Sequence, residues 1–294
     1  MMPVRLISLL DKTIDDDRRS PVADIVARSW DLPPGSARWW RSSACHVFLV
    51  PPAGYLRFVP DEVRAAESFA AIAALMAELS GRGLGVVAPV PSAYGRQTET
   101  VQTSLGTMHA MLLTAAPGEP IGVEDLTGQQ AQAWGTALAR LHATTLGTEP
   151  RGGLFAELSD LDDRTSAALL LAQLAEVPPD DVGLVHGDFE LDNLAWSGGI
   201  PVAYDFDEAT VSWFAADVAI AVRDIANRPN LLAEFLSGYR QIRPLDTTHL
   251  KLFARAQAAC SIVRARRALA GAGDELPDLQ ARLRRHIERQ RLIV

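Results

Sequence analysis

The order of apolar and polar positions predicts a small antiparallel sheet in the first third of the chain. Five segments have strand composition and are bounded by turn residues: 39–43, 46–50, 55–59, 99–104 and 108–114. Pro51-Pro-Ala-Gly54 predicts the hairpin turn between the second and third of them. A short helix is expected before this sheet. Apolar residues at helical spacing predict a second helix over 61–80.

The pattern changes after a Pro/Gly-rich joint at 116–120 and becomes mainly helical. Helices are expected over three ranges: 129–142, 165–175 and most of 214–294. Between them, residues 183–208 predict a loop-and-strand segment. The sequence therefore predicts an α+β protein with two domains, 1–115 and 116–294, and a cleft at the joint.

Composition and charge narrow the class of protein. The chain has 294 residues, 48% of them hydrophobic, with two cysteines and a net charge of −8. It has no apolar stretch near the ~18 residues that a membrane span needs, and the apolar run at 6–10 is too short for a signal peptide. We expect a cytoplasmic protein that does not bind membranes.

Charge is unevenly distributed along the chain. Residues 250–294 hold ten basic and four acidic residues, so the rest of the chain carries −14. An acidic body disfavours nucleic acid as a partner and suits a cationic substrate. The 28 basic residues include only two lysines, Lys12 and Lys251, and neither follows a glycine-rich turn, which excludes a P-loop nucleotidase.

One segment carries the clearest chemical signal. Asp188 and Asn193 lie five residues apart in the loop His186-Gly-Asp-Phe-Glu-Leu-Asp-Asn193, and Asp205 ends the apolar strand that follows. A loop and a returning strand can bring these three side chains together. Carboxylate and amide oxygens suit Mg²⁺, which usually shares its ligands with phosphate. A carboxylate outside the metal site can then act as the base for an attacking hydroxyl, as in phosphoryl transfer.

The sequence also resembles a known family. His186-Gly-Asp-x4-Asn193 with Asp205-Phe-Asp is similar to the catalytic core of aminoglycoside phosphotransferases and of choline and homoserine kinases. The segments from Trp134 to His142 and from Met111 to Gly118, and Asp217-Val-Ala, resemble further parts of that family. The resemblance implies a bilobal protein-kinase-like fold, with a small antiparallel-sheet N-terminal lobe and a larger, mainly helical C-terminal lobe.

Roles follow from this resemblance. Asp188 would be the catalytic base, Asn193 and Asp205 would hold Mg²⁺, and His186 would orient the loop. Residues implied to contact the nucleotide are Ser42, Ser43 and Ala44 over the phosphates, and Leu113, Thr114 and Ala116 around adenine. The nucleotide would be ATP, with GTP as the alternative.

The third strand departs from the family pattern. The family usually has a phosphate-contacting lysine there, whereas this chain has Arg57, with Glu67 as the matching acid in the following helix. Arginine keeps the charge and binds phosphate, but its planar fork is larger. The sequence therefore favours a working enzyme in which Arg57 contacts the phosphates.

The acceptor and two rival functions stay open. The expected acceptor is a hydroxyl of a small molecule, such as an aminoglycoside, an amino alcohol or a sugar, and an aminoglycoside would imply antibiotic resistance. Glu190, Asp192 and Asp207 beside the predicted site could bind a cationic acceptor or be solvated. The alternatives are a catalytically weak or non-catalytic nucleotide-binding protein of kinase fold and a phosphatase-type hydrolase, the latter suggested by Asp205-Phe-Asp. We expect a monomer or a homodimer.

Overall fold

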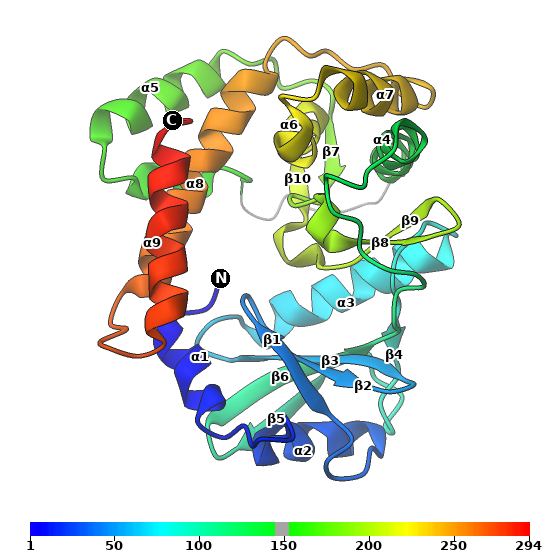
Figure 1. Ribbon diagram of the computed structural model, residues 1–294, viewed down its shortest axis with the longest axis vertical. Helices are drawn as coiled ribbons and strands as arrows, with labels where there is room; N and C mark the ends of the chain where they lie inside the picture. The colour runs from blue at the N-terminus through cyan, green and yellow to red at the C-terminus, as the bar shows by residue number, and fades with distance from the viewer. Residues whose placement is uncertain (145–152) are drawn as a thin grey trace. The chain divides into compact units, whose positions relative to one another are not determined.

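The computed structural model describes residues 1–144 and 153–294 and divides them into two compact units (Figure 1). Unit 1 consists of Met1–Ala116 and Ala265–Arg284, and unit 2 of Pro117–Arg264 and Arg285–Val294. The sequence predicts a nucleotide-binding domain over residues 1–115 and a catalytic domain over residues 116–294. These two assignments stay predictions.

Unit 1 contains a six-stranded antiparallel sheet. Its strands are β1 (Arg38–Ser42), β2 (His46–Val50), β3 (Gly54–Pro60), β4 (Pro89–Val90), β5 (Glu99–Thr103) and β6 (Gly106–Leu113). The order is β1-β2-β3-β6-β4, and β5 pairs with β6. The five predicted strands are confirmed within two residues, while the two-residue β4 was not predicted because it is too short to show an alternating pattern.

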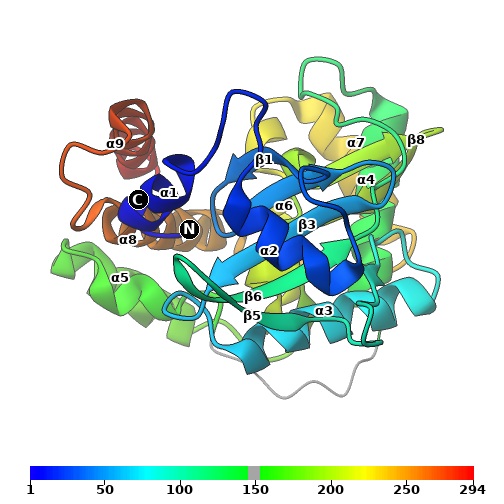
Figure 2. The same cartoon turned by 90° about the horizontal axis from the view of Figure 1, so that it is seen from below.

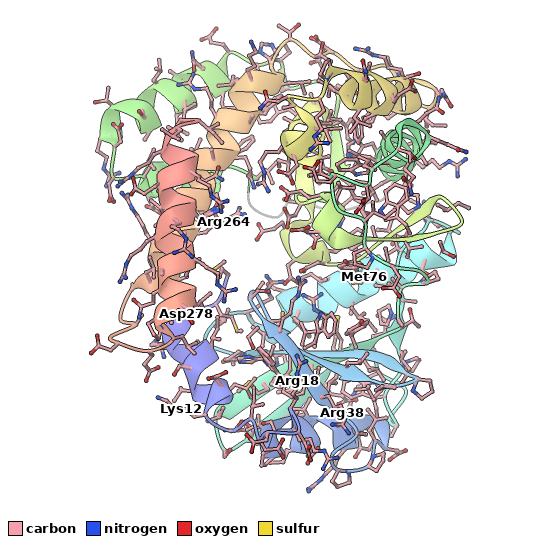
Figure 3. All side chains as sticks on the ribbon, in the orientation of Figure 1. Lys12, Arg18, Arg38, Met76, Arg264 and Asp278 are labelled. Carbon is pink, nitrogen blue, oxygen red and sulfur yellow. The ribbon has the colours of Figure 1, made fainter. Side chains whose placement is uncertain are left out.

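Helices cover both faces of this sheet (Figure 2). Helices α1 (Val4–Asp11) and α2 (Pro21–Ala27), followed by the short helix η1 (Arg28–Trp30), pack on one face. Their buried partners on the strands alternate along the chain, as the pleat requires: Phe48, Val50, Leu56, Phe58, Met108, Ala110 and Leu112. Helix α3 (Ala66–Gly81) covers the other face with buried side chains that include Met76, labelled in Figure 3.

Helix α3 begins five residues later than the pattern predicts. The backbone N–H groups of Val63 and Arg64 both donate to the carbonyl of Pro60, which makes a turn. Ala65 then has extended backbone, with ψ 151°, before the helix starts. The polar residues at 61–64 therefore belong to a turn and not to the exposed face of a first helical turn.

Unit 2 is mainly helical and has two small antiparallel sheets. Its helices are α4 (Gly128–His142), α5 (Arg164–Ala175), α6 (Phe214–Ala221) and α7 (Pro229–Arg240). The sheets pair β7 (Val182–Val185) with β10 (Thr210–Trp213), and β8 (Leu194–Ser197) with β9 (Ile200–Ala203). Short helices occur at η2 (Ala156–Asp160), η3 (Leu191–Asn193), η4 (Phe206–Glu208) and η5 (Arg223–Ile225). Residues of both units form α8 (Leu250–Leu269) and α9 (Pro277–Arg291).

Helices α4 and α7 pack unusually closely. A Cβ at Gly135 would lie 2.0 Å from the Phe235 carbonyl oxygen, and one at Gly238 would lie 2.0 Å from the Gln132 carbonyl oxygen. The Thr136 hydroxyl donates to the Gly238 carbonyl at 3.1 Å. This contact between backbones fixes the helix ends that carry His142 and Tyr239.

The architecture confirms the predicted α+β class, with an antiparallel sheet in the N-terminal region and helices dominating the C-terminal region. Predicted helices 129–142 and 165–175 correspond to α4 and α5. Across the described ranges, 1–144 and 153–294, no helix has the length and apolar character to cross a membrane.

Candidate active site

The loop that carries Asp188 follows β7 in unit 2 and requires a glycine. Gly187 has φ +80°, and a Cβ there would lie 2.5 Å from the carbonyl oxygen of Glu208. Glycine tolerates both the left-handed backbone and this close approach. The loop can therefore rest directly on the segment that follows Asp205.

Asp217, in the first turn of α6, anchors this loop through hydrogen bonds to its backbone. Its carboxylate accepts hydrogen bonds from the backbone N–H groups of His186 and Gly187, at 2.7 and 2.9 Å, and from Nε2 of His142 at 3.0 Å. Burial opposes its ionisation, but the hydrogen bonds from His142 and His186 keep the pKa of Asp217 below its usual value. Asp217 is thus a buried carboxylate that holds the loop through its backbone.

Burial favours the neutral form of the two histidines around Asp217. His142 is fully buried, and burial lowers its pKa; its Nε2–H donates to Asp217 while Nδ1 accepts from the Tyr239 hydroxyl at 2.7 Å. Burial likewise lowers the pKa of His186, whose Nδ1 accepts from the Asp188 backbone N–H and whose Nε2 donates to the Tyr204 carbonyl. His186 therefore orients the loop, as predicted, and ties it to the end of β9.

Asp188 and Asn193 are in direct contact. The Asn193 amide nitrogen donates to the Asp188 carbonyl at 2.9 Å and to Asp188 Oδ2 at 2.8 Å. Burial, and next the charge of Asp205, raise the pKa of Asp188 to about 6. A carboxylate with a pKa close to neutral pH is suited to receive a proton from a substrate hydroxyl.

Asp205 lies two residues beyond the end of β9 and directly before η4, in left-handed backbone with φ 67° and ψ 61°. A non-glycine residue in this region is uncommon, and such strain concentrates at functional sites. Since Asn193 uses its amide nitrogen on Asp188, its amide oxygen is the atom left for a cation. Asn193 and Asp205 therefore fit a hard divalent ion that takes its other ligands from phosphate and water.

Two protein ligands are few for a divalent ion, which agrees with an ion that takes further ligands from phosphate. Within the part of the chain that the structure describes, no group of three or more His, Cys, Asp or Glu side chains could hold a metal ion by itself. The charge of Asp205 raises the pKa of Asp188, so the two carboxylates repel each other. A cation arriving with the nucleotide would relieve that repulsion.

A second carboxylate stands beside the loop. Glu190 is 7% exposed, and its Oε2 accepts from the Arg223 guanidinium at 2.6 Å. Burial, and next the charge of Asp188, raise the pKa of Glu190 to about 8, against the opposing effect of Arg223. The sequence named Glu190 only as a neighbour of the site and missed Arg223, which lies 33 residues away and has no local signal.

A half-buried arginine supports the segment after Asp205. Arg264 on α8, labelled in Figure 3, donates to both carboxylate oxygens of Glu157, at 3.0 and 3.3 Å. Its third nitrogen pairs with Glu208 at 3.0 Å. Because Glu208 packs against Gly187, the pair of Arg264 with Glu208 connects α8 to the loop of Asp188, and the bidentate pair with Glu157 fixes the guanidinium.

The residues predicted to contact the nucleotide lie in unit 1. Arg57 on β3 is 5% exposed, and one of its guanidinium nitrogens donates to Cys45 Sγ at 3.5 Å. Glu67 is exposed in the first turn of α3. Pairing of Arg57 with Glu67, and contact of either with phosphate, stay predictions.

The predicted phosphate loop joins β1 to β2, and two of its residues already have hydrogen-bond partners. The Ser42 hydroxyl accepts from Trp39 Nε1 at 3.1 Å and donates to His46 Nδ1 at 2.9 Å. The Ser43 backbone N–H donates to the Cys45 carbonyl, and the Ser43 carbonyl accepts from Met2. A side-chain contact from Ser42 to phosphate would break this chain of bonds, while Ala44, which is half-buried, offers only backbone.

The residues predicted to surround adenine lie at and just beyond the end of β6: Leu113, Thr114 and Ala116. Leu113 is buried, Thr114 is exposed, and Ala116 is half-buried. The Thr114 backbone N–H donates to the Ala88 carbonyl at 2.9 Å, and its hydroxyl accepts from the Ala88 N–H at 3.1 Å. Thr114 therefore keeps its carbonyl, and not its N–H, for a ligand.

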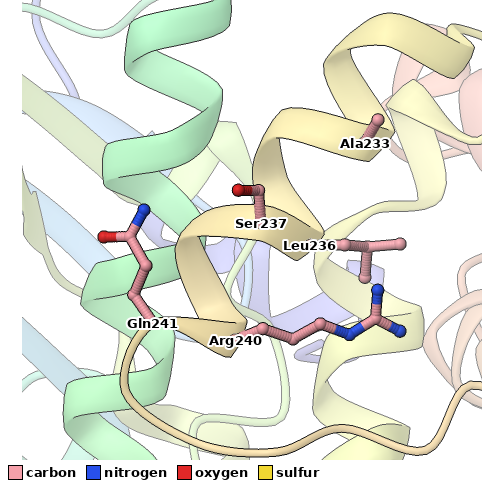
Figure 4. Close-up of a pocket in the computed structure, with 5 residues that line it drawn as sticks. All are labelled: Ala233, Leu236, Ser237, Arg240 and Gln241. Carbon is pink, nitrogen blue, oxygen red and sulfur yellow. The ribbon is translucent and has the colours of Figure 1, made fainter.

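A separate hollow of about 550 Å³ lies along α7 in unit 2 (Figure 4). Five residues line it: Ala233, Leu236, Ser237, Arg240 and Gln241. None of them belongs to the group around Asp188, so this hollow carries no argument about catalysis.

The chain combines a sheet unit with a helical unit, and the helical unit carries Asp188 on a loop that requires Gly187, next to Asn193 and Asp205. This combination is that of a small-molecule kinase of protein-kinase-like fold. The model of the phosphotransferase enzyme family matches residues 47–253. The chain belongs to this family, and it is a phosphotransferase that acts on hydroxyl groups of small molecules.

Solved structures confirm the fold. An amicoumacin kinase, in complex with AMP-PNP and Ca²⁺, is 21% identical with TM-score 0.75, and the match covers 95% of each chain. A microcompartment-associated aminopropanol kinase is 18% identical with TM-score 0.67, covering 92% of this chain and 94% of the other. A choline/ethanolamine kinase family protein from Mesorhizobium loti is 15% identical with TM-score 0.64, covering 88% of each. No match was found among curated proteins.

Proposed function

We propose that the protein transfers the γ-phosphoryl group of ATP to a hydroxyl of a small molecule, with Asp188 as the base. The observation that carries the proposal is the Asp188–Asn193 contact, 2.8 Å between the carboxylate and the amide, beside the strained Asp205. Nucleotide complexes of similar structures, with AMP-PNP and with ADP, support nucleotide use. GTP is the alternative donor, since a similar kanamycin-binding structure contains GDP.

In the proposed reaction the acceptor oxygen forms a bond to the γ-phosphorus, the bond from that phosphorus to the β–γ bridging oxygen breaks, and ADP leaves. The hydroxyl proton passes to the Asp188 carboxylate. Asn193 and Asp205 would hold Mg²⁺, which supplies charge neutralisation at the phosphates when it is bound. The hydrogen bond from Asn193 keeps the Asp188 carboxylate oriented toward the hydroxyl.

Unit 1 would hold the donor. Thr114 would present its carbonyl and Ala116 its backbone N–H to adenine, with Leu113 providing apolar contact. Arg57 would contact the phosphates as a permanently charged fork, supported by Glu67. Ala44 would cover the phosphates through its backbone N–H and Ser43 through its hydroxyl, since the backbone groups of Ser43 and the Ser42 hydroxyl are bonded within the unit. A cytoplasmic location and a monomeric or dimeric state belong to the same proposal.

The test is ATP consumption with a panel of hydroxyl compounds, comparing wild type with Asp188→Asn. We expect the variant to lose about 10²- to 10⁴-fold in kcat while it keeps its affinity for ATP, because only proton transfer is removed. The matched control is Asp180→Asn, an exposed loop aspartate outside the site. Transfer by Asp188→Asn at the wild-type rate, or nucleotide binding without transfer to any acceptor, would contradict the proposal.

The metal assignment is tested separately. Asp205→Asn should weaken Mg²⁺-dependent ATP binding, measured by calorimetry at several Mg²⁺ concentrations, and leave the thermal unfolding midpoint close to wild type. Mg²⁺–ATP affinity that is unchanged in Asp205→Asn would show that the ion is held elsewhere.

A further inference from the structure

Tyr204 connects the two segments that carry the candidate metal ligands. It directly precedes Asp205, and its side chain and backbone reach the short helix η3, which ends at Asn193. Its backbone N–H donates to the Asn193 carbonyl at 3.1 Å, and its hydroxyl donates to the Asp192 carbonyl at 2.9 Å. One residue therefore holds the helix of one candidate ligand and is bonded in sequence to the other.

The end of η3 depends on these two donors. The last carbonyls of a helix have no partner inside it, and a helix of one 3₁₀ turn consists almost entirely of its ends. The Leu191 carbonyl accepts from the backbone N–H that follows the helix. The next two carbonyls, of Asp192 and Asn193, accept from the hydroxyl and the N–H of Tyr204. Tyr204 thus caps η3 at the end where Asn193 lies.

The same residue constrains the backbone at Asp205. His186 Nε2 donates to the Tyr204 carbonyl at 3.2 Å, so hydrogen bonds engage the N–H, the carbonyl and the hydroxyl of the residue before Asp205. The left-handed backbone of Asp205 persists only where neighbouring contacts over-determine it. Two of the three bonds use backbone groups that any residue has, so the hydroxyl is the contact that tyrosine itself contributes.

The position of two ligands from separate segments matters most for an ion with strict geometry. Mg²⁺ requires nearly octahedral coordination at about 2.0–2.1 Å, whereas Ca²⁺ accepts flexible arrangements at about 2.3–2.6 Å. A contact that fixes η3 against the segment after β9 would therefore favour Mg²⁺ over Ca²⁺.

We propose that Tyr204 is a positioning residue whose hydroxyl fixes the separation of Asn193 and Asp205 for the Mg²⁺ that arrives with the nucleotide. The proposal rests on the phosphotransferase function and the metal assignment proposed above. Tyr204 acts through the Asp192 carbonyl, so it is neither a metal ligand nor a group that transfers a proton.

The experiment measures the binding of AMP-PNP, a non-hydrolysable ATP analogue, by calorimetry in EDTA, in Mg²⁺ and in Ca²⁺. Wild type is compared with Tyr204→Phe, which removes the hydroxyl and keeps the ring and both backbone bonds. The matched control is Tyr94→Phe, which removes the hydroxyl of a tyrosine that is 69% exposed. Asp205→Asn tests the metal assignment in the same series, and urea titration verifies that each variant is folded.

Tyr204→Phe should bind AMP-PNP in Mg²⁺ about threefold to tenfold more weakly than wild type, because one hydrogen bond that holds the ligands in place is lost. The decrease in Ca²⁺ should stay below about twofold, since Ca²⁺ tolerates an altered separation of its ligands. Binding in EDTA should not change, and Tyr94→Phe should match wild type in all three conditions. A hydroxyl that only stabilised the fold would not produce an unequal response to the two ions.

The remaining outcomes separate this inference from its foundation. Equal weakening in Mg²⁺ and Ca²⁺, or wild-type affinity in Mg²⁺, overturns the role of Tyr204, while loss of Mg²⁺-dependent affinity in Asp205→Asn keeps the metal assignment. If Asp205→Asn retains that affinity, the ion is held elsewhere and the inference falls with the assignment, although transfer can still depend on Asp188. A wild type that does not bind AMP-PNP in any of the three conditions removes the proposed function itself.

Discussion

The residues around Asp188 in unit 2 and the predicted nucleotide contacts in unit 1 are held in different ways. In unit 2, long-range hydrogen bonds fix the functional loop through its backbone: Asp217 reaches His186 and Gly187 across about thirty residues of sequence. In unit 1, near neighbours tie up the side chains themselves, as Ser42 is bonded to Trp39 and His46. The first arrangement leaves Asp188 and the oxygen of Asn193 for chemistry, and the second leaves mainly backbone groups.

This difference teaches which substitutions report on function. Changes to the residues of unit 2 that anchor the loop, such as Asp217, remove its support, so stability and activity fall together. Changes in unit 1 affect local packing first, because the candidate phosphate contacts are made by backbone, by the Ser43 hydroxyl or by a single guanidinium.

Asp217→Asn should be the most damaging substitution. An amide has only one acceptor oxygen for three donors, and it brings a donor group toward buried N–H groups. We expect a loss of about 3–5 kcal/mol in the free energy of unfolding, because hydrogen bonds to an ionised group are weakened and at least one buried donor is left without an acceptor. Urea titration measures it, with the exposed Asp224→Asn as the control. A loss below about 1 kcal/mol would show that the loop does not depend on this carboxylate.

Acid should weaken the fold through buried histidines in both units. Burial lowers the pKa of His46 to about 4. Its unfolded form takes up a proton near pH 6.5 while the folded form does not, so stability is lost as pH falls below 6.5. At about 1.4 kcal/mol per pKa unit, the loss by pH 4 is on the order of 3 kcal/mol.

His142 and His186 add to this loss in the same direction, since burial also lowers their pKa values. Urea titrations between pH 4 and pH 8 measure the slope, and His46→Gln should reduce it. A free energy of unfolding that rises as the solution is acidified would refute the neutral assignment of these histidines.

Arg57→Lys should have an intermediate effect on activity. The guanidinium is buried on β3 and contacts Cys45, so the shorter point charge of lysine cannot reproduce its fork. We expect kcat/KM for ATP to fall about tenfold with the acceptor saturating. Arg38→Lys, an exposed arginine on β1, is the control. Full activity in Arg57→Lys would mean that only the positive charge at this position matters.

Ser42→Ala should have the smallest effect. The substitution removes the donor to His46 Nδ1 and should cost about 1 kcal/mol of unfolding free energy. The KM for ATP should stay within twofold, because the hydroxyl is engaged inside the unit and not with phosphate. A tenfold higher KM for ATP without loss of stability would restore Ser42 as a phosphate ligand.

The parts of the fold that the sequence predicted are those with local causes. Five strands of unit 1 and helices α4 and α5 have clear periodicity and clear turn residues. The strands β7, β8 and β10 have only four residues each, too few for a pattern to develop. The start of α3 was missed because a turn at Pro60 competes with the helix for the same polar residues.

The candidate site shows the same division. Spacing within one short segment was enough to group Asp188, Asn193 and Asp205. Arg223 lies 33 residues from its partner Glu190, and Arg264 lies 107 residues from its partner Glu157. No local pattern indicates contacts over such separations in sequence. The internal bonding of Ser42 likewise depends on how a β-hairpin brings His46 opposite it.

Arginine at position 57 also has a consequence for chemical labelling. Acylating nucleotide reagents modify the neutral amine of a lysine beside the phosphates, and a guanidinium does not react with them at ordinary pH. The two lysines of the chain are Lys12, exposed and paired with Glu275, and the exposed Lys251. An acyl-phosphate ATP probe should therefore leave the phosphate end of the nucleotide site unlabelled in this enzyme, and Arg57→Lys should introduce the missing target.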